Sequence, residues 1–545
     1  MRYAQLKILV PILVLAVLIL CPVAMIFARA FGAADGFWVT FAHTGNAEAI
    51  LNSLVLGAAV VVGATVIAFP LAYILSRTDI GRHRFIDIVL MIPFMTPPYI
   101  ASMGWILFMQ KRGLFQQLFP WTGKWSEHFF SFFGLALVMS LHVFPFMMTV
   151  LKNAMMNLPR SLEESGAVFG AGPVRRMGRI FVPLISGNYA IGALLVFVKT
   201  LSEYGTPATL GRRIGFAVFT TDIHRFATTS PIDFGSAARL STVLVVICMG
   251  AWLLQSHITA RRTYRLVGGR SGRRGTDALS VPGRALAWTY LGIVMLLAIG
   301  VPYFSTIATS LIKLRGYGLA AGNFTVQHYR ELFYENEKGI DALRTSLLLA
   351  VSSASIAAFL GTLIVSWGRK CTPWLKKTTE GIALLPQMLP GIVLVIGMML
   401  FWNGVYRIAP LYNTVGMMVV AYVALFLPFT VQYVGSAYLQ LGANLEQSGR
   451  VFGASGPYVF RRITFPLIFR GILTGWMMTF IIAFRELVTA SLIAPPNVLV
   501  VSTYIMREFE QGSVSVGMAM AVICMLLSVA ILLLVNRFVD GKGDR

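Results

Sequence analysis

The sequence predicts an all-α integral membrane protein of about twelve transmembrane helices, arranged as two parallel six-helix repeats. Three observations lead to this fold class. Of the 545 residues, 57% are hydrophobic and only 12% are charged, with a mean hydropathy of +0.74. About a dozen apolar runs approach the ~20 residues that a helix needs to cross a bilayer. The two halves of the chain also resemble each other.

Each apolar run is long enough for one span. We place the spans near residues 7–28, 49–75, 86–109, 131–151, 184–203, 236–256, 285–309, 343–367, 381–402, 414–436, 467–490 and 516–536. The first run has basic residues before it and Ala28-Arg29-Ala30 after it, as a signal peptide would. Because its apolar stretch is longer than the roughly 7–15 residues of the hydrophobic region of a signal peptide, we favour an uncleaved first helix.

The net charge of +23, from 45 basic and 22 acidic residues, has two possible explanations. A soluble protein with this excess would be expected to bind nucleic acid. In a membrane protein, Lys and Arg instead accumulate in cytoplasmic loops. With the N-terminus inside, 27 of the 45 basic residues fall in the predicted inner segments. This bias predicts a multi-pass inner-membrane protein with both termini in the cytoplasm and no nucleic-acid partner.

An internal duplication determines the arrangement of the spans. Residues 162–185 and 445–468 agree at 13 of 24 positions at an offset of 283, and the same offset pairs Glu203 with Glu486. Earlier in each half, residues 93–97 match residues 386–390 at an offset of 293. With about six spans per copy, both copies enter the membrane from the same side, so the repeats are parallel and their axis lies along the membrane normal.

The duplication also sets the predicted domain boundaries. Residues 1–258 form the first repeat, 259–284 a cytoplasmic linker rich in Arg, Gly and Ser, and 285–545 the second repeat. Gly-rich and Ser-rich segments behave as flexible chain. The linker lacks the GxxxxGK[ST] pattern that phosphate binding would require.

The strongest similarity between the repeats lies in an inner loop, which suggests that both copies meet a similar partner. Each loop reads as a short helix, a break at glycine, and a second helix leading into a span. The candidate contact residues are Glu163, Glu164, Ser165, Gly166 and Gly170 in the first copy, and Glu446, Gln447, Ser448, Gly449 and Gly453 in the second. An ordinary solvated loop would not explain why so many positions match.

This loop resembles the EAA loop of permease subunits in binding-protein-dependent ABC importers of type I. The pattern of an acidic residue, a glycine and a proline runs from Glu164 through Gly170 to Pro183, and returns with Gln447 in place of the glutamate. The motif's two alanines are replaced by Ser-Gly in both copies, which keeps these positions small. A single duplicated chain is similar to the iron(III)-transport branch of this family, with its MetI-like permease fold.

The resemblance implies a translocation subunit rather than an enzyme. ATP and magnesium would be bound by a separate cytoplasmic ATPase dimer, whose two subunits would each receive one loop. A periplasmic or lipid-anchored binding protein would deliver the substrate. The resemblance favours ferric iron, with thiamine, polyamine, phosphonate and sulfate as alternatives. Gln447 makes Glu446 the candidate acidic contact of the second loop.

Charged residues near the spans are candidates for a gate or pathway. Ionisable groups inside a membrane are costly and therefore suggest function. Lys199 lies four residues before Glu203, and Arg485 adjoins Glu486. The alternative is that these residues form structural ion pairs or extend to the outer interface.

Other functional classes have less support. The seven histidines are scattered and no cysteine lies in a CxxC motif, so we expect no bound metal or cofactor on this chain. A secondary transporter would need coupling carboxylates within the spans and commonly uses inverted repeats. A membrane-embedded enzyme would need a nucleophile with a base, or a metal cluster.

Overall fold

The structure is a computed structural model that describes residues 2–32, 44–158, 160–261, 279–369, 371–441 and 443–540. Most of the predicted linker 259–284 lies outside the described residues. Within these ranges, ten helices are long and apolar enough to cross a membrane, and two bent helix pairs bring the number of spans to as many as 12. Helices suit this environment because they satisfy their own backbone hydrogen bonds. The predicted all-α membrane fold is confirmed.

The chain divides into two compact units. Unit 1 comprises residues 1–42, 223–245 and 325–545, and unit 2 comprises residues 43–222 and 246–324. The helices of unit 1 are α1 (Arg2–Leu15), α2 (Cys21–Phe31), α18 (Glu337–Gly368), α19 (Pro373–Leu384), α20 (Gly391–Gly404), α21 (Val415–Leu439), α22 (Ala443–Val451), α23 (Gly456–Val459), η10 (Phe460–Thr464), α24 (Phe465–Phe484), α25 (Val488–Ile493), α26 (Val501–Gln511) and α27 (Val514–Asp540).

Unit 2 repeats the series from α18 through α24 with additional short helices, whereas its span equivalent to α1 and α2 comes last along the chain. Its helices are α4 (Thr44–Arg77), α5 (Arg84–Met95), α6 (Pro98–Met109), α7 (Leu114–Leu118), α8 (Trp125–Phe129), α9 (Phe132–Met156), α10 (Arg160–Val168), α11 (Pro173–Arg176), η4 (Met177–Phe181), α12 (Val182–Ser202), η5 (Pro207–Gly211), α15 (Val281–Met295) and α16 (Val301–Leu311). The division between the units falls within α13 (Phe219–Thr228) and α14 (Phe234–Arg261).

Two of the predicted spans are sharply bent. The span near 86–109 consists of α5 and α6, which meet at 88°, and the span near 381–402 consists of α19 and α20, which meet at 106°. The bends fall at Pro97-Pro98 and at Pro390, where the proline ring and the missing N–H end the preceding helix. Equivalent bends in the two halves follow from equivalent prolines.

The first helix of each repeat packs on the bent span of the other repeat. In unit 1, α2 lies against α20, and in unit 2, α16 lies against α6. Both contacts need a glycine: a Cβ added to Gly397 would lie 2.4 Å from the Pro22 carbonyl oxygen, and one added to Gly104 would lie 2.6 Å from that of Pro302. Gly104 and Gly397 are separated by the 293-residue offset of the duplication. The compact units therefore combine segments of both sequence repeats.

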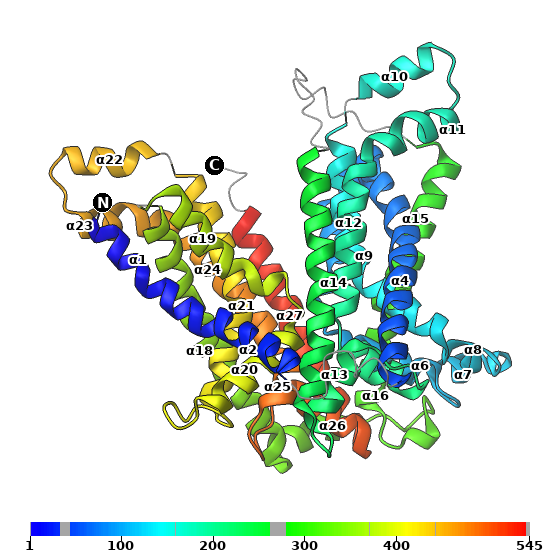
Figure 1. Cartoon of the computed structure of the whole chain (residues 1–545). Helices are drawn as coiled ribbons and strands as arrows, with labels where there is room; N and C mark the ends of the chain where they lie inside the picture. The colour runs from blue at the N-terminus through cyan, green and yellow to red at the C-terminus, as the bar shows by residue number, and fades with distance from the viewer. Residues whose placement is uncertain are drawn as a thin grey trace. The chain divides into compact units, whose positions relative to one another are not determined.

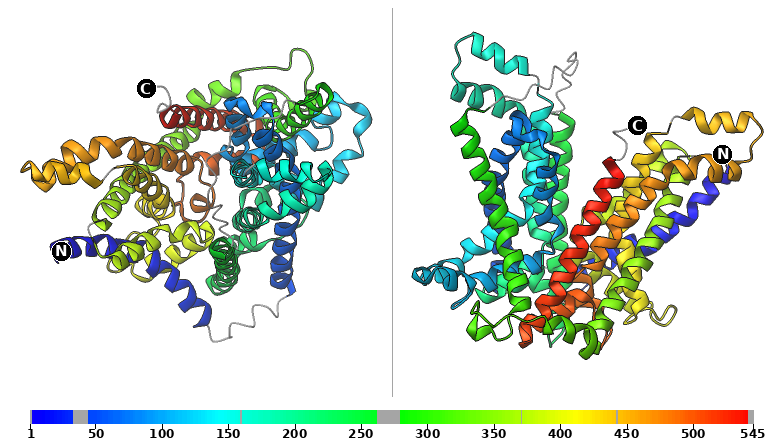
Figure 2. Two further views of the ribbon diagram at one scale, coloured as in Figure 1. Left: turned by 90° about the horizontal axis from the view of Figure 1, so that it is seen from above. Right: turned by 180° about the vertical axis from the view of Figure 1, so that it is seen from behind.

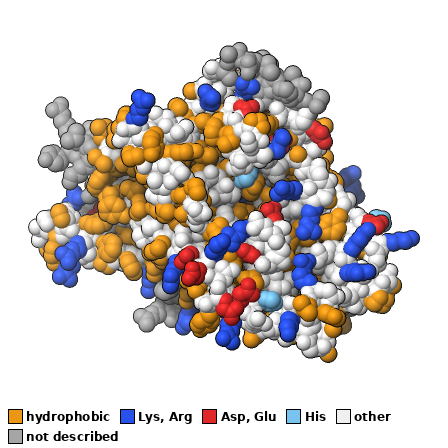
Figure 3. Space-filling view, turned by 90° about the horizontal axis from the view of Figure 1, so that it is seen from below, with side chains coloured by type: hydrophobic (Ala, Val, Ile, Leu, Met, Phe, Trp, Pro, Cys, Tyr) orange, Lys and Arg blue, Asp and Glu red, His pale blue; other side chains and the backbone are white. Residues whose placement is uncertain are grey.

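The remaining spans form a helical bundle in each unit. In unit 2, α4 packs on α9 and α9 on α12; in unit 1, α18, α21 and α24 pack on one another. Helices α24 and α27 of unit 1 run side by side (Figure 2). In the same unit, the start of α1 and the end of α27 lie at the end that carries α22 (Figure 1). Seen from the opposite end, the surface carries acidic and basic side chains among large apolar areas (Figure 3).

Candidate functional site

Each repeated loop folds as two short helices joined by a tight turn. The first loop, residues 160–181, contains α10 and α11, and the second loop, residues 443–464, contains α22 and α23. Each continues through a π-helical turn, η4 or η10, into the following span. Each loop also projects beyond the spans of its own unit (Figure 1). The two loops thus have the same secondary structure as well as related sequences.

A glycine in left-handed conformation ends the first helix of each loop. Gly170 has φ of +77° and Gly453 has φ of +82°. In the first loop the N–H groups of Gly170 and Ala171 donate to the carbonyls of Ala167 and Gly166, both at 2.9 Å. This is the Schellman pattern, which satisfies the last carbonyls of a helix and favours glycine because it has no Cβ. The same two hydrogen bonds recur in the second loop.

A second glycine in each loop permits a close contact with the helix that returns to the membrane. A Cβ added to Gly166 would lie 2.7 Å from Ile180 Cδ1, and one added to Gly449 would lie 2.8 Å from Ile463 Cδ1. A larger residue would push α10 away from η4, or α22 away from η10. Packing inside each loop therefore favours a small residue at this position.

The predicted polar contact residues are arranged differently in the two loops. Glu164 and Ser165 are exposed on α10, whereas the side chain of Glu163 lies outside the described residues. In the second loop, Gln447 and Ser448 are exposed. The Oε1 atom of Glu446 accepts a hydrogen bond from the Thr464 hydroxyl at 3.0 Å, so this carboxylate turns toward η10.

The tip of each loop carries two exposed apolar side chains that the sequence analysis did not single out. Val168 and Phe169 are 84% and 89% exposed, and Val451 and Phe452 are 83% and 90% exposed. Both pairs belong to the Val-Phe-Gly sequence shared by the two loops, which was the available signal. An exposed phenylalanine at the end of a rigid projection is typical of a surface that binds another protein.

The side chain of Glu203 caps the backbone that follows the end of α12. Its carboxylate accepts the N–H groups of Gly205 at 2.7 Å and Thr206 at 3.0 Å. Its backbone carbonyl accepts the hydroxyl of Thr220 at 2.8 Å. These bonds connect the end of α12 to the start of the next segments of unit 2.

Glu486 has the same role after α24 in unit 1. Its carboxylate accepts the N–H of Thr489 at 3.0 Å, and its carbonyl accepts the hydroxyl of Ser502. The carboxylates of Glu203 and Glu486 thus make equivalent hydrogen bonds, and so do their backbone carbonyls. The geometry favours the structural interpretation of both glutamates.

None of the cap hydrogen bonds described above involves Lys199 or Arg485, the two basic candidates. Lys199 Nζ lies 5.9 Å from the centroid of the Phe146 ring, a cation–π contact. Within the described part of the chain, Lys199 and Glu203 form no ion pair, because α12 ends at Ser202 and Glu203 is extended. The predicted helical i,i+4 pair is therefore not formed. Arg485 is the residue at which α24 ends.

We expect Glu203→Ala and Glu486→Ala to lower the melting temperature of the protein, because each loses a cap of about 1 kcal/mol. Glu203→Gln keeps one acceptor oxygen and should therefore lower the melting temperature less than Glu203→Ala does. Thermal unfolding of the purified chain, followed by size-exclusion chromatography, measures this. Glu127→Ala is the control, since that side chain is 68% exposed and its ion pair with Lys111 is long, at 3.6 Å. Unchanged melting with lost transport would instead indicate a pathway role.

Among the described residues, no group of three or more His, Cys, Asp or Glu side chains is arranged to hold a metal ion.

Comparison with known proteins finds one family twice in the chain. Residues 64–264 and 344–542 each match the family described as the inner membrane component of binding-protein-dependent transport systems. The chain is 25% identical over 498 residues to the ferric transport system permease protein FbpB of Actinobacillus pleuropneumoniae, covering 89% of this chain and 70% of that protein.

Two further relatives differ in length. The chain is 22% identical to the Fe(3+)-transport system permease protein FbpB 2 of Haemophilus influenzae, covering 88% of each chain. It is 25% identical to the molybdenum transport system permease protein ModB of Escherichia coli, covering 38% of this chain and 90% of that protein. Similarity to the shorter relative extends over less than half of this chain.

Proposed function

This chain belongs to the family of inner-membrane components of binding-protein-dependent transport systems, and from this premise we propose that it is the translocation subunit of an ATP-driven importer of ferric iron. ATP and magnesium would be bound by a separate cytoplasmic ATPase dimer. A periplasmic or lipid-anchored binding protein would deliver the substrate to the outer side.

The single observation that carries this proposal is the pair of matching loops. Each presents an exposed Val-Phe tip on a glycine turn, held rigidly on a span. Two equivalent projections suit a partner that itself has two equivalent grooves. The candidate docking residues are the ten loop residues named in the sequence analysis, to which we add the exposed tip residues Val168, Phe169, Val451 and Phe452.

The proposed orientation places the loops and both termini in the cytoplasm of a bacterial cell. In unit 1, α22, the start of α1 and the end of α27 lie at one end, which supports this orientation (Figure 1). The basic residues of the inner segments support it as well. We also propose that residues 1–258 and 285–545 are the duplicated permease repeats, joined by the linker 259–284.

Ferric iron is the proposed substrate because three relatives that match 82–89% of the chain are named as ferric or Fe(3+) transport permeases. Sulfate and molybdate are the second candidates, because shorter relatives are named as sulfate and molybdenum permeases. Iron would be cargo handed over by the binding protein, without ligands from a metal centre in this chain.

The test is uptake of radioactive iron by proteoliposomes that contain this chain with its ATPase, with the iron-loaded binding protein added on the outer side. We expect uptake only when the chain, the ATPase, ATP with magnesium and the binding protein are all present. Uptake driven by a proton or sodium gradient without ATP would contradict the proposal and favour a secondary transporter. ATP-dependent uptake of sulfate or molybdate, but not iron, would retain the mechanism and change the substrate.

A further inference from the structure

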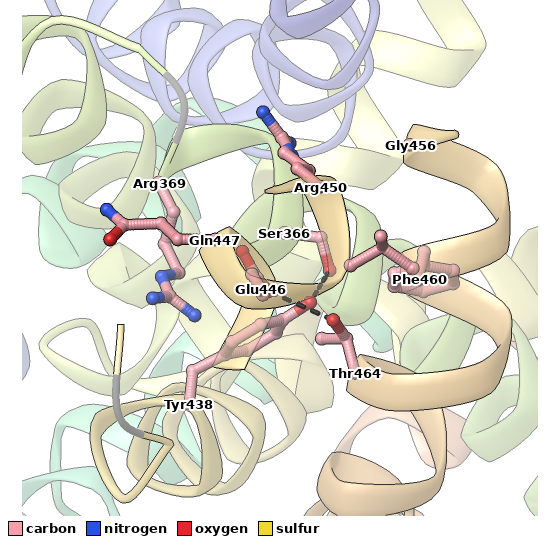
Figure 4. A pocket seen from close by; sticks show the side chains of 10 residues that line it. Ser366, Arg369, Tyr438, Glu446, Gln447, Arg450, Gly456, Phe460 and Thr464 are labelled. Atoms are coloured by element: carbon pink, nitrogen blue, oxygen red, sulfur yellow. Dashed lines mark hydrogen bonds between the residues drawn. The ribbon is translucent and has the colours of Figure 1, made fainter. Parts of the chain in front are cut away.

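A cleft opens beneath the second loop, between α22 and the ends of α18, α19 and α21 in unit 1. It consists of two cavities of about 270 and 530 Å³. Both are lined by Arg369 and Tyr438, so they adjoin. Figure 4 shows the smaller cavity, in which the hydroxyls of Ser366, Tyr438 and Thr464 gather around Glu446. The larger cavity is more apolar, with Val365, Leu384 and Val431 among its lining residues.

The internal duplication shows which residues fill this place in the first half. In unit 2, Lys152 of α9 forms an ion pair with Asp87 of α5. At the offsets of 283 and 293, their counterparts are Gly435 of α21 and Glu380 of α19. A Cβ added to Gly435 would meet no atom within 4 Å. The side chain that connects the two helices in unit 2 is therefore replaced by open space in unit 1.

A second replacement enlarges the cleft at the loop. Phe181 of unit 2 is 2% exposed, lies edge-on to Tyr73 and has the guanidinium of Arg77 5.5 Å from its ring centroid. Its counterpart at an offset of 283 is Thr464, which instead donates to Glu446. The buried aromatic ring of Phe181 in unit 2 is thus replaced by the small hydroxyl side chain of Thr464 in unit 1. Both replacements remove side-chain volume from unit 1, so the cleft there is open where the packing of unit 2 is filled.

The groups at the rim of the cleft are mainly cationic. The guanidinium of Arg369 lies 4.6 Å from the centroid of the Tyr438 ring. Among the described residues it has no carboxylate or carbonyl partner, so its donors remain available. Arg450 of α22 also lines the smaller cavity, and Figure 4 shows its guanidinium extending away from the hydroxyl cluster. Lys376 lines the larger cavity.

The acidic groups of the cleft are already engaged. Glu446 accepts from Thr464 at 3.0 Å, and Glu380 faces Lys376 at 3.9 Å. The Tyr438 hydroxyl is hydrogen-bonded to that of Ser366 at 2.6 Å. An arginine held over an aromatic ring, with its N–H donors unused, is suited to a phosphate group.

We propose that this cleft binds a phosphate-bearing anion, with Arg369 as the principal contact and Arg450 as a second one. The cleft has apolar walls beside its basic rim, so the headgroup and the upper acyl chain of an anionic phospholipid fit it; a free phosphate would use the same basic groups. Since Arg450 and Glu446 belong to α22, occupancy would stabilise the second loop but not the first. That consequence rests on the proposed function, whereas the binding itself does not.

The experiment measures binding without ATPase or transport. The full-length chain is placed in nanodiscs of equal parts phosphatidylglycerol and phosphatidylcholine, extracted with mild detergent, and its retained lipids are counted by native mass spectrometry. In a second arm, the chain in neutral detergent is titrated with inorganic phosphate by calorimetry. Arg369→Gln removes the principal contact, and Gly435→Lys supplies the amine that Lys152 supplies in unit 2.

We expect both variants to retain at least fivefold less phosphatidylglycerol than the wild type. Gly435→Ala and Arg462→Gln are the matched controls: the first adds only a methyl group to α21, and the second removes an exposed arginine of the same loop outside the cleft. Both should retain wild-type lipid. If Arg369→Gln and Gly435→Lys lose phosphate binding in the second arm but retain wild-type lipid in the first, the site is supported and its ligand is a soluble phosphate. Wild-type behaviour of folded Arg369→Gln in both arms would overturn the proposal.

Discussion

Valine at Gly170 and Gly453 together is expected to reduce the amount of ATPase that co-purifies with the chain at least tenfold. Both glycines have φ near +80°, where a side chain costs roughly 1–2 kcal/mol per residue. The chain would relieve this strain by unwinding the turn, which would move the exposed Val-Phe tip away from its position on the span. A tenfold loss of binding corresponds to about 1.4 kcal/mol, so strain in two loops is sufficient.

The matched control places valine at Gly172 and Gly456, which lie two residues after Gly170 and three residues after Gly453. Neither has a positive φ, and a Cβ added to either would meet no atom within 4 Å. The control should bind the ATPase as the wild type does. The melting temperature of all variants should be unchanged, because the loops project beyond the spans. Normal ATPase binding by the Gly170 and Gly453 variant would argue against the loops as docking sites.

The fold could be predicted from the sequence because its signals are local and periodic. Apolar runs of sufficient length and one strong repeat were enough for an all-α membrane protein with up to 12 spans. The packing of α2 on α20 and of α16 on α6 could not be predicted. It depends on contacts between distant segments, and its only local trace is the pair of glycines at 104 and 397, which read as ordinary residues of apolar helices.

The loop residues were predictable as a set, whereas their individual orientations were not. The repeat identified Gly170 and Gly453, and their positive φ explains why glycine stands there. Sequence alone did not show that Glu446 turns toward Thr464, because that contact joins two helices of the loop. For the same reason, the sequence does not show that Glu203 caps Gly205 and Thr206.

The cleft under α22 illustrates what the duplication adds once a structure is available. The sequence contains Lys152 against Gly435 and Phe181 against Thr464 as simple mismatches between repeats. Only the ion pair to Asp87 and the open space at Gly435 show that these mismatches remove material from the same place in the fold. Differences between the copies are therefore as informative about binding as their similarities.

Serine at both Phe169 and Phe452 is expected to weaken ATPase binding by a factor of about 100 or more. Fully burying a phenylalanine side chain contributes roughly 1.5–3 kcal/mol, and two such side chains insert if both loops are engaged. Because the two rings are 89% and 90% exposed in the free chain, their removal should leave its melting temperature unchanged. Equilibrium binding of labelled ATPase to the chain in nanodiscs measures the effect.

The matched control is Ile408→Ser, which removes an equally exposed apolar side chain (87%) outside both loops and should leave ATPase binding intact.

The single variants Phe169→Ser and Phe452→Ser separate the contributions of the two loops to ATPase binding. If each phenylalanine enters an equivalent groove, Phe169→Ser and Phe452→Ser should each cause about half of the total loss in binding free energy, since distant sites are nearly additive. The second loop has an exposed glutamine where the first has Glu164, so added salt should weaken binding less in Phe169→Ser than in Phe452→Ser. Equal salt dependence of the two variants would show that Glu164 makes no charged contact with the ATPase.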